Sequence, residues 1–191
     1  MQNSIQNAAK KRQVHISKAE YDSVVRVNHA GEYGAKRIYE GQMHALKNSK
    51  CYDEIRHMYE QELIHLAYFE NLAKQKRVRP TFLSPAWHFL GFALGKISGL
   101  LGDKYAMACT AAVEEVIDDH YYKQQKLLSK VPGEEKLLQK ITQFRNEEIE
   151  HKSRGLEYVH STAQSNSVGV NIFMFGVKTA TKIAISLSKR V

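Results

Sequence analysis

The sequence predicts an all-α fold built on four long helices. Only three of its 191 residues are proline, and leucine, alanine, glutamate, lysine and glutamine, which favour helix, are plentiful. Alternating runs of Val, Ile or Thr bounded by turn residues are nearly absent, and no Asn-Gly or Asp-Gly pair marks a hairpin. A chain of this length can bury a substantial core. We therefore expect one helical domain.

The first two helices are expected at residues 17–50 and 52–76. Ser17 and Glu20 have the spacing of a capping box, which satisfies free backbone N–H groups at a helix start. The second helix ends before Pro80, because the residue preceding a proline disfavours the helical conformation.

The third and fourth helices are expected at residues 84–101 and 103–130. Ser84 and Pro85 have the form of an N-cap followed by proline at the first helical position. The third helix is apolar and carries a glycine at every fourth position, and Gly102 separates it from the fourth.

The last two helices are expected at residues 134–160 and 170–189. The Val-Pro-Gly sequence at 131–133 forms a turn before the fifth helix. The polar segment 161–169 forms a linker, and the sixth helix is amphipathic.

The order of helix lengths predicts how the helices pack. The short apolar third helix lies between two long pairs, where a crossover connection would run. This layout predicts a four-helix bundle with an apolar crossover helix and an added C-terminal amphipathic helix. Residues 1–16 are polar and are expected to be a flexible lead-in, with residues 17–191 forming the single domain.

Glutamate and histidine recur in a spacing that places both on one helix face, because residues three apart are neighbours. A sequence this rich in both residues produces such pairs by chance, so helix phase must decide which face inward. The Glu-x-x-His pairs are Glu54/His57, Glu62/His65, Glu148/His151 and Glu157/His160.

Helix phase, at about 100° per residue, selects two of these pairs. On the fifth helix, Glu148 falls on the centre line of the apolar stripe and His151 lies about 60° to one side. Glu157 lies about 180° away, on the solvent face. On the second helix, Glu62 is central in the stripe, whereas His57 points away.

The other two long helices each carry one carboxylate at the middle of the buried face. These residues are Glu32, in the first helix, and Glu114, in the fourth. The same phase argument predicts that Glu147 and Glu150 are mostly solvated.

Four buried carboxylates need compensating positive charge, because burying one alone costs several kcal/mol and four would repel one another. Lys36, Arg145 and Lys152 lie near the edges of the stripes, but they explain neither all four acids nor the histidines. Two divalent metal ions explain both, and oxygen with imidazole ligands suits iron or manganese. The order Glu, Glu-x-x-His, Glu, Glu-x-x-His is that of ferritin-like dimetal bundles.

Asp118 and Tyr121 also lie on the inward stripe of the fourth helix. Asp118 could accept a hydrogen bond from a ligand histidine, or it could be a helix-edge carboxylate paired with a lysine. Tyr121 could contact a substrate, although a core tyrosine with a satisfied hydroxyl group explains it equally well.

Charge and cysteine content exclude some classes of protein. The formal net charge is +8 at pH 7, but no nucleic-acid-binding motif accompanies it, so no nucleic-acid partner is expected. The two cysteines form no CxxC motif and fit a reducing compartment. No apolar stretch follows the basic N-terminal residues, and no clean membrane span is recognised.

Four segments carry a family resemblance, namely RVNHAGEYGAKRIYEGQM (26–43), FLSPAWHFLGFALG (82–95), AMACTAAVEEVIDDHYYKQ (106–124) and FRNEEIEHKSRGLE (144–157). They closely resemble the demethoxyubiquinone hydroxylases of ubiquinone biosynthesis, and the resemblance covers nearly the whole chain. The resemblance implies a non-haem di-iron monooxygenase that hydroxylates the ring of a polyprenylated demethoxyquinone. It implies two iron ions, O2 as co-substrate and reducing equivalents from NADH. No GxGxxG nucleotide motif occurs here.

The resemblance also implies roles for individual residues. His120 and Tyr121 match family positions near the substrate and the iron. The metal ligands carried over are Glu32, Glu62, His65, Glu114, Glu148 and His151, the same six that helix phase selects.

The apolar third helix and the amphipathic sixth helix predict peripheral attachment to a membrane lipid surface. The third helix could instead be a buried crossover whose glycines allow close packing, and the sixth could simply close the bundle. The implied location is the cytoplasmic face of a bacterial cell membrane or the matrix face of the mitochondrial inner membrane. A lipid-presenting biosynthetic protein and a homo-oligomer remain open as partners.

The alternative hypothesis is a soluble ferritin-like iron-binding protein or oxidase that uses the same six ligands. Such a protein would not need the apolar segment around residues 87–101.

Overall fold

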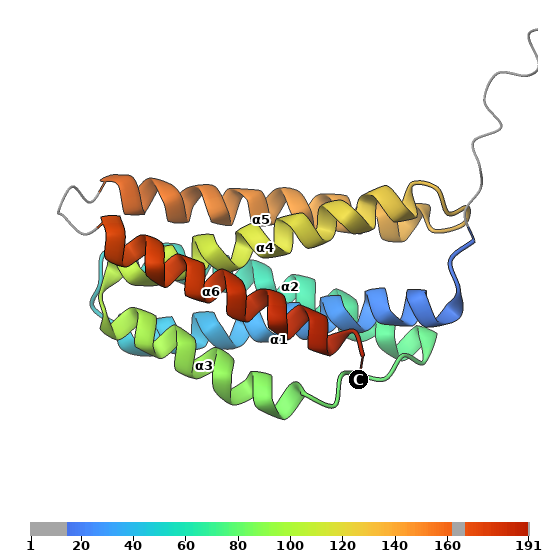
Figure 1. Cartoon of the computed structure of the whole chain (residues 1–191), viewed down its shortest axis with the longest axis horizontal. Coiled ribbons are helices and arrows are strands. Elements are labelled where there is room, and N and C mark those ends of the chain that lie inside the picture. Colours follow the sequence, from blue (N-terminus) through green and yellow to red (C-terminus); the bar gives the residue numbers. More distant parts are fainter. Residues whose placement is uncertain (1–14, 162–166, 191) are drawn as a thin grey trace, which may run out of the picture.

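All regular structure in residues 15–161 and 167–190, which the computed structural model describes, is helical. This confirms the predicted all-α class and the order of the elements. The predicted lead-in at 1–16 falls almost wholly outside the described residues, as does the centre of the 161–169 linker. The helices are α1 (Lys18–Ala45), α2 (Tyr52–Lys76), α3 (Ser84–Leu100), α4 (Asp103–Leu128), α5 (Glu135–Ser161) and α6 (Ser167–Ser188) (Figure 1).

Local signals fix where the helices begin and end. The Ser17 hydroxyl accepts from the Glu20 backbone N–H at 3.2 Å, and the Glu20 carboxylate accepts from the Ser17 backbone N–H at 2.9 Å, so the predicted capping box is present. α1 ends at Ala45 rather than near residue 50, because the polar segment 47–50 forms turns and has no apolar side chain to bury against the bundle.

Helices α1, α2, α4 and α5 form the predicted four-helix bundle, with α1 beside α2 and α4 beside α5 (Figure 1). α3 is the crossover between the two pairs and packs along α1. α6 lies against α4. The ferritin-like arrangement predicted from the sequence is therefore confirmed, and it directs one face of each long helix toward a common interior.

The glycines of α3 serve close packing on α1. A Cβ atom added at Gly95 would collide with the backbone carbonyl group of Ile38, and one added at Gly41 would collide with the carbonyl group of Phe92. Only glycine allows the two backbones to approach this closely. The crossover interpretation of the third helix is thus correct for its glycine-bearing side.

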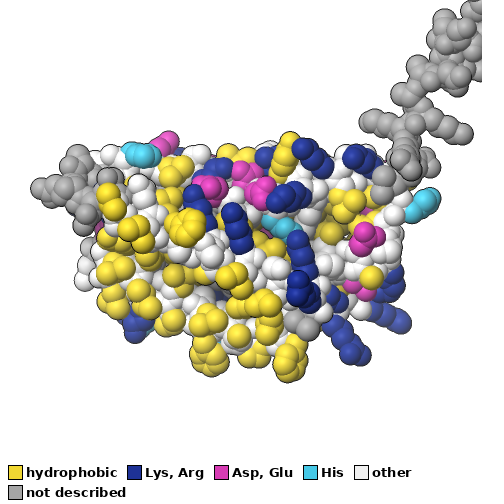
Figure 2. Space-filling model, in the orientation of Figure 1, with side chains coloured by type: hydrophobic (Ala, Val, Ile, Leu, Met, Phe, Trp, Pro, Cys, Tyr) yellow, Lys and Arg dark blue, Asp and Glu magenta, His cyan; other side chains and the backbone are white. Residues whose placement is uncertain are grey.

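The outer side of α3 and much of α6 expose apolar side chains to the surroundings. Figure 2 shows hydrophobic side chains gathered over this part of the surface, with lysines and arginines beside them. We call this surface the α3–α6 face. Its exposed large residues are Phe89, Leu90, Ile97, Leu100, Leu101, Val168, Ile172, Phe175, Ile183 and Leu187.

α6 is also long and apolar enough to cross a membrane, as judged by length and composition over Val168–Ser188. This segment was not recognised from the sequence, because its lysines interrupt the apolar run. The helix packs on α4, where Val170, Met174 and Val177 enter the core. An ion pair of 2.7 Å also joins Lys178 Nζ to Glu115 Oε2.

Candidate metal centre

The six acids and histidines predicted to face inward meet in the middle of the bundle. They are all buried, and Glu62, His65 and Glu148 have no exposed surface. Two groups of four form, and within each group the potential ligand atoms lie within 4.8 Å of one another. The groups are Glu32, Glu62, His65 and Glu148, and Glu62, Glu114, Glu148 and His151.

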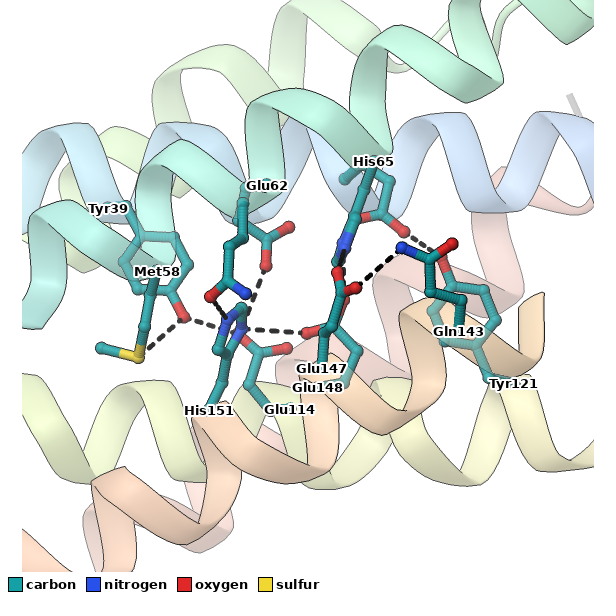
Figure 3. Close-up of polar contacts among 12 residues, drawn as sticks. Tyr39, Met58, Glu62, His65, Glu114, Tyr121, Gln143, Glu147, Glu148 and His151 are labelled. Atoms are coloured by element: carbon teal, nitrogen blue, oxygen red, sulfur yellow. Dashed lines mark hydrogen bonds and ion pairs between the residues drawn. The ribbon is translucent and has the colours of Figure 1, made fainter. Parts of the chain in front are cut away.

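Glu62 and Glu148 belong to both groups, and the geometry of Glu148 fits a bridging position. Its Oε1 lies 3.0 Å from His65 Nδ1, and its Oε2 lies 3.2 Å from His151 Nδ1. The two oxygen atoms of one carboxylate thus face opposite halves of the centre (Figure 3). This arrangement suits two ions held side by side with shared carboxylates.

The atoms that point into the centre have no hydrogen-bond partner. Both oxygens of Glu62 and of Glu148 are buried and unpartnered, as are Glu114 Oε2 and the Nδ1 atoms of His65 and His151. Buried polar atoms in proteins are almost always satisfied, so a cluster of orphaned atoms calls for an explanation. A pair of metal ions would satisfy them, and the donor set therefore fits the predicted metals.

Lysine and arginine side chains form no ion pair with these carboxylates in the part of the chain that the structure describes. Arg145 and Lys152, two of the cations expected near the stripe edges, both pair with Asp118, at 2.8 and 2.6 Å. Lys36 pairs with Glu40 at 3.1 Å. Positive charge for the interior must therefore come from protons or from bound cations.

The pKa values describe how the chain behaves without metal. Burial raises the pKa values of Glu62 and Glu114, and the negative charge of Glu148 raises both further. Burial also opposes ionisation of Glu148, but the adjacent His151 and His65 outweigh it and lower its pKa to about 2. Burial disfavours the charged form of His65, yet Glu148 and Glu32 raise its pKa well above the ordinary value. Without metal, Glu62 and Glu114 are thus biased toward the protonated form and Glu148 toward the ionised form.

Two tyrosines hold the carboxylates that are not shared. The Tyr121 hydroxyl donates to Glu32 Oε1, and the Tyr39 hydroxyl donates to Glu114 Oε1 at 3.0 Å. Both tyrosines are fully buried, and their carboxylate partners raise their pKa values further after burial itself. Tyr121 was predicted to face inward, whereas no role was predicted for Tyr39.

The outer nitrogen of each histidine also has a partner. His65 Nε2 lies 2.5 Å from Glu147 Oε2, and His151 Nε2 lies 2.8 Å from Gln61 Oε1. The expectation that Glu147 is mostly solvated was wrong, because its carboxylate turns along the flank of α5 toward α2. A signal was available, since Gln61 and Glu147 each directly precede an inward glutamate.

The structure does not bring Asp118 or His120 into the centre. Asp118 is a helix-edge carboxylate paired with Arg145 and Lys152, the second of its two proposed roles. His120 is half-buried, and its Nε2 lies 2.8 Å from Gln124 Nε2. Burial, together with the charges of Lys189 and Lys123, lowers the pKa of His120 to about 4.

An apolar cavity of about 560 Å³ lies beside the centre, between α1, α3, α4 and α6. Gly31 and Val113, which line it, directly adjoin Glu32 and Glu114 in the sequence. Exposed lining residues such as Leu90 and Ile183 place its mouth on the α3–α6 face. Apolar pockets of this size commonly take small-molecule ligands.

Comparisons with known proteins identify a family and several relatives. The model of the family described as "Ubiquinone biosynthesis protein COQ7" matches residues 19–188. The human "NADPH-dependent 3-demethoxyubiquinone 3-hydroxylase, mitochondrial" is 46% identical over 179 residues, which cover 93% of this chain and 81% of the human protein. The "3-demethoxyubiquinol 3-hydroxylase" of Rhodospirillum rubrum is 44% identical over 173 residues, covering 89% and 78%. The "5-demethoxyubiquinone hydroxylase, mitochondrial" of Saccharomyces cerevisiae is 36% identical over 185 residues, again covering 89% and 78%.

Proposed function

The chain belongs to the family of ubiquinone biosynthesis protein COQ7, and on this premise we propose that it hydroxylates the ring of a polyprenylated demethoxyubiquinone or its quinol with O2. It is an enzyme of the hydroxylase class, as the names of its relatives indicate. The observation that carries the proposal is the cluster of orphaned carboxylate and imidazole atoms beside an apolar cavity.

Two iron ions are the proposed cofactor. The proposed ligands are Glu32, His65, Glu114 and His151 at the outer positions, with Glu62 and Glu148 shared. When bound, the iron ions would supply the redox chemistry that activates O2. Four carboxylates balance the charge of two divalent ions, which would remove the cost of burying the acids without partners.

The protein side chains hold this centre in place. Hydrogen bonds from Tyr121 to Glu32 and from Tyr39 to Glu114 fix the two outer carboxylates. Outer partners of the histidines keep the imidazole protons on Nε2 and leave Nδ1 free to face the centre. We propose that His120 makes no direct contact with the substrate. Tyr121 is proposed to act by holding the Glu32 carboxylate in position.

The apolar cavity is the proposed site for the quinone ring and the first part of its tail. A tail can enter from the α3–α6 face between Leu90 and Ile183, which line the cavity and reach the surface. Gly34 leaves space on the α1 wall, because a Cβ atom added there would have no heavy atom within 4 Å.

The cavity assignment is tested with Gly34→Leu. The new side chain fills open space, so the fold should be kept, and the helix should gain roughly 1 kcal/mol from losing a glycine. Thermal melting checks that the fold is kept, and we expect the metal content to be unchanged. Steady-state assays should give a KM for the quinone that is at least about tenfold higher. An unchanged KM would place the substrate elsewhere.

Peripheral attachment to the lipid surface of an inner or cell membrane is part of the proposal, and it is supported by the exposed apolar side chains of the α3–α6 face. Mitochondrial and bacterial relatives support a bioenergetic membrane as the location. A lipid-presenting partner protein and a homo-oligomer are compatible with this surface.

The source of reducing equivalents is proposed to be a nicotinamide nucleotide. The family resemblance implies NADH, whereas the name of the human relative specifies NADPH. Parallel assays with the two nucleotides at equal concentration decide which one the chain uses.

The decisive assay supplies the iron-loaded protein with a short-tailed demethoxyubiquinone, a nicotinamide nucleotide and ¹⁸O2. We expect a hydroxylated quinone that carries one ¹⁸O atom, detected by mass spectrometry. Iron oxidation by O2 without conversion of the quinone would support the alternative, a ferritin-like iron-binding protein or oxidase.

A further inference from the structure

The candidate metal centre has two nearly equivalent halves. Glu32 of α1 is held by Tyr121 of α4, and Glu114 of α4 is held by Tyr39 of α1. In each of these helices the tyrosine follows the glutamate by seven residues, which is about two turns. α1 and α4 therefore each contribute a glutamate to one half of the centre and a tyrosine to the other half.

α2 and α5 repeat the equivalence with their Glu-x-x-His pairs. His65 of α2 directs Nδ1 into the centre and Nε2 toward α5, and His151 of α5 directs Nδ1 into the centre and Nε2 toward α2. The residue that meets each Nε2 occupies the same position in its helix, directly before the shared glutamate.

The equivalence is broken at that position. His65 meets the carboxylate of Glu147 at 2.5 Å, whereas His151 meets the neutral amide oxygen of Gln61 at 2.8 Å. Glu147 is also anchored, because Gln143 Nε2 donates to its other oxygen at 3.0 Å (Figure 3). One half of the centre thus has a negative group behind its histidine, and the other half does not.

We infer that Glu147 and Gln61 are positioning residues that make the two metal positions unequal, with the His65 position binding its ion more tightly. This inference rests on the proposed function, since it takes the cluster to hold two ions. The physical reason is that an imidazole donating to a carboxylate is a stronger metal ligand than one donating to an amide.

The inequality has a chemical consequence for the proposed reaction. A stronger donor stabilises the more highly charged form of its metal ion, so an ion held by His65 would be the more easily oxidised of the two. An ion held by His151 would correspondingly be the better electrophile. The chain thereby distinguishes two positions that its four bundle helices otherwise build alike.

Isosteric exchange tests the inference. The full chain is prepared as wild type, Glu147→Gln, Gln61→Glu and the double exchange, and each is crystallised with less than one equivalent of Co²⁺. Anomalous scattering then gives the occupancy at each position, and calorimetric titration with Co²⁺ gives the two affinities. Glu150→Gln is the matched control, because Glu150 lies on the same helix with a side chain 60% exposed.

In the wild type we expect the first ion at His65. Glu147→Gln should lower the affinity of that position by about 10- to 100-fold, the range seen when such outer partners are lost. Gln61→Glu should raise the affinity of the His151 position, and the double exchange should send the first ion to His151. Glu150→Gln should behave as the wild type.

Equal filling in the wild type, or an order that survives the double exchange, would overturn the inference and leave the dimetal proposal intact. A wild-type chain that binds no Co²⁺, Mn²⁺ or Fe²⁺ would instead overturn the proposed function, and the inference with it.

Discussion

The interior of the bundle and the α3–α6 face reverse the ordinary distribution of side chains in opposite ways. Between α1, α2, α4 and α5, four carboxylates and two histidines are buried, and all of them except Glu32 have unpartnered atoms. On the α3–α6 face, Phe89 is 72% exposed and Phe175 is 73% exposed. One region is too polar for a core, and the other is too apolar for a surface facing water.

The comparison teaches that each region carries an energetic cost that a partner outside the chain would remove. A buried unpaired carboxylate costs several kcal/mol, and a large apolar side chain left in water forgoes about 1.5–3 kcal/mol of burial. Under the proposed function the two anomalies differ in the partner that would complete them, which is a cation for the interior and lipid for the face. The cavity lies between the two regions, because two of its lining residues directly precede Glu32 and Glu114 in the sequence and its mouth lies on the face.

Removing a shared carboxylate should disrupt iron binding in the polar interior more than any other change. We expect Glu148→Ala to bind neither iron ion firmly and to lose more than about 100-fold in activity, beyond the usual cost of losing an outer partner. Iron content by elemental analysis and the quinone assay measure both effects. Glu150→Ala on the solvent side of the same helix is the control, and a Glu148→Ala protein with full iron content would contradict the proposed centre.

Removing the metal should lower the stability of the folded protein without any change of sequence. An ion present at 100 times its Kd stabilises the folded state by about 2.7 kcal/mol, which corresponds to a rise in Tm of roughly 5–11 °C for a chain of this size. Differential scanning calorimetry of chelator-treated and iron-loaded protein checks this. Identical melting curves, with iron shown to be bound, would mean that the interior needs no cation.

Adding a charge to the apolar region should affect membrane binding alone. We expect Phe89→Glu to reduce binding to anionic vesicles by at least about tenfold, because the insertion of one large apolar side chain is lost. Vesicle sedimentation measures the change, and the iron content should stay constant. Ile64→Glu is the matched control, since Ile64 is 62% exposed on α2 and lies outside the α3–α6 face. Equal loss in both variants would argue against that face as the attachment surface.

The smallest expected effect concerns Asp118, which forms ion pairs with the basic side chains of Arg145 and Lys152. Burial opposes its ionisation, but Lys152 and Arg145 outweigh it and lower its pKa. A lowered pKa in the folded state contributes stability above the unfolded value near 3.8, and this is lost as the pH falls through the folded value.

Asp118→Asn should therefore destabilise the protein by about 1 kcal/mol at pH 7. The difference from the wild type should shrink as the pH is lowered from 5 toward 3. Urea unfolding at stepped pH provides the measurement, and a difference that stays constant over this range would show that the Asp118 charge is not the cause.

Much of the fold was predictable because its signals are local. The capping box of Ser17 and Glu20, the proline at position 80 and the glycine before α4 act within a few residues, and each marked an element boundary. The late end assigned to the first helix had a tertiary cause. Leu46 still packs in the core, whereas the polar residues 47–50 have no apolar side chain to bury against the bundle and form turns instead.

The sequence by itself also determined that six acidic and imidazole side chains face inward, because the direction of a side chain in a helix follows from its spacing to the apolar stripe. Their identity as metal ligands is a prediction from the same pattern. Glu148 was placed by phase alone, and no knowledge of the other helices was needed.

Only the tertiary structure decided what each of these groups meets. The pairing of His65 with Glu147, of Glu114 with Tyr39 and of Arg145 with Asp118 joins residues on different helices. The cavity likewise exists only where α3 and α6 pack beside α1 and α4. Spacing along one helix fixes the direction of a side chain, whereas its partner depends on the register and distance of the neighbouring helix, which long-range packing sets.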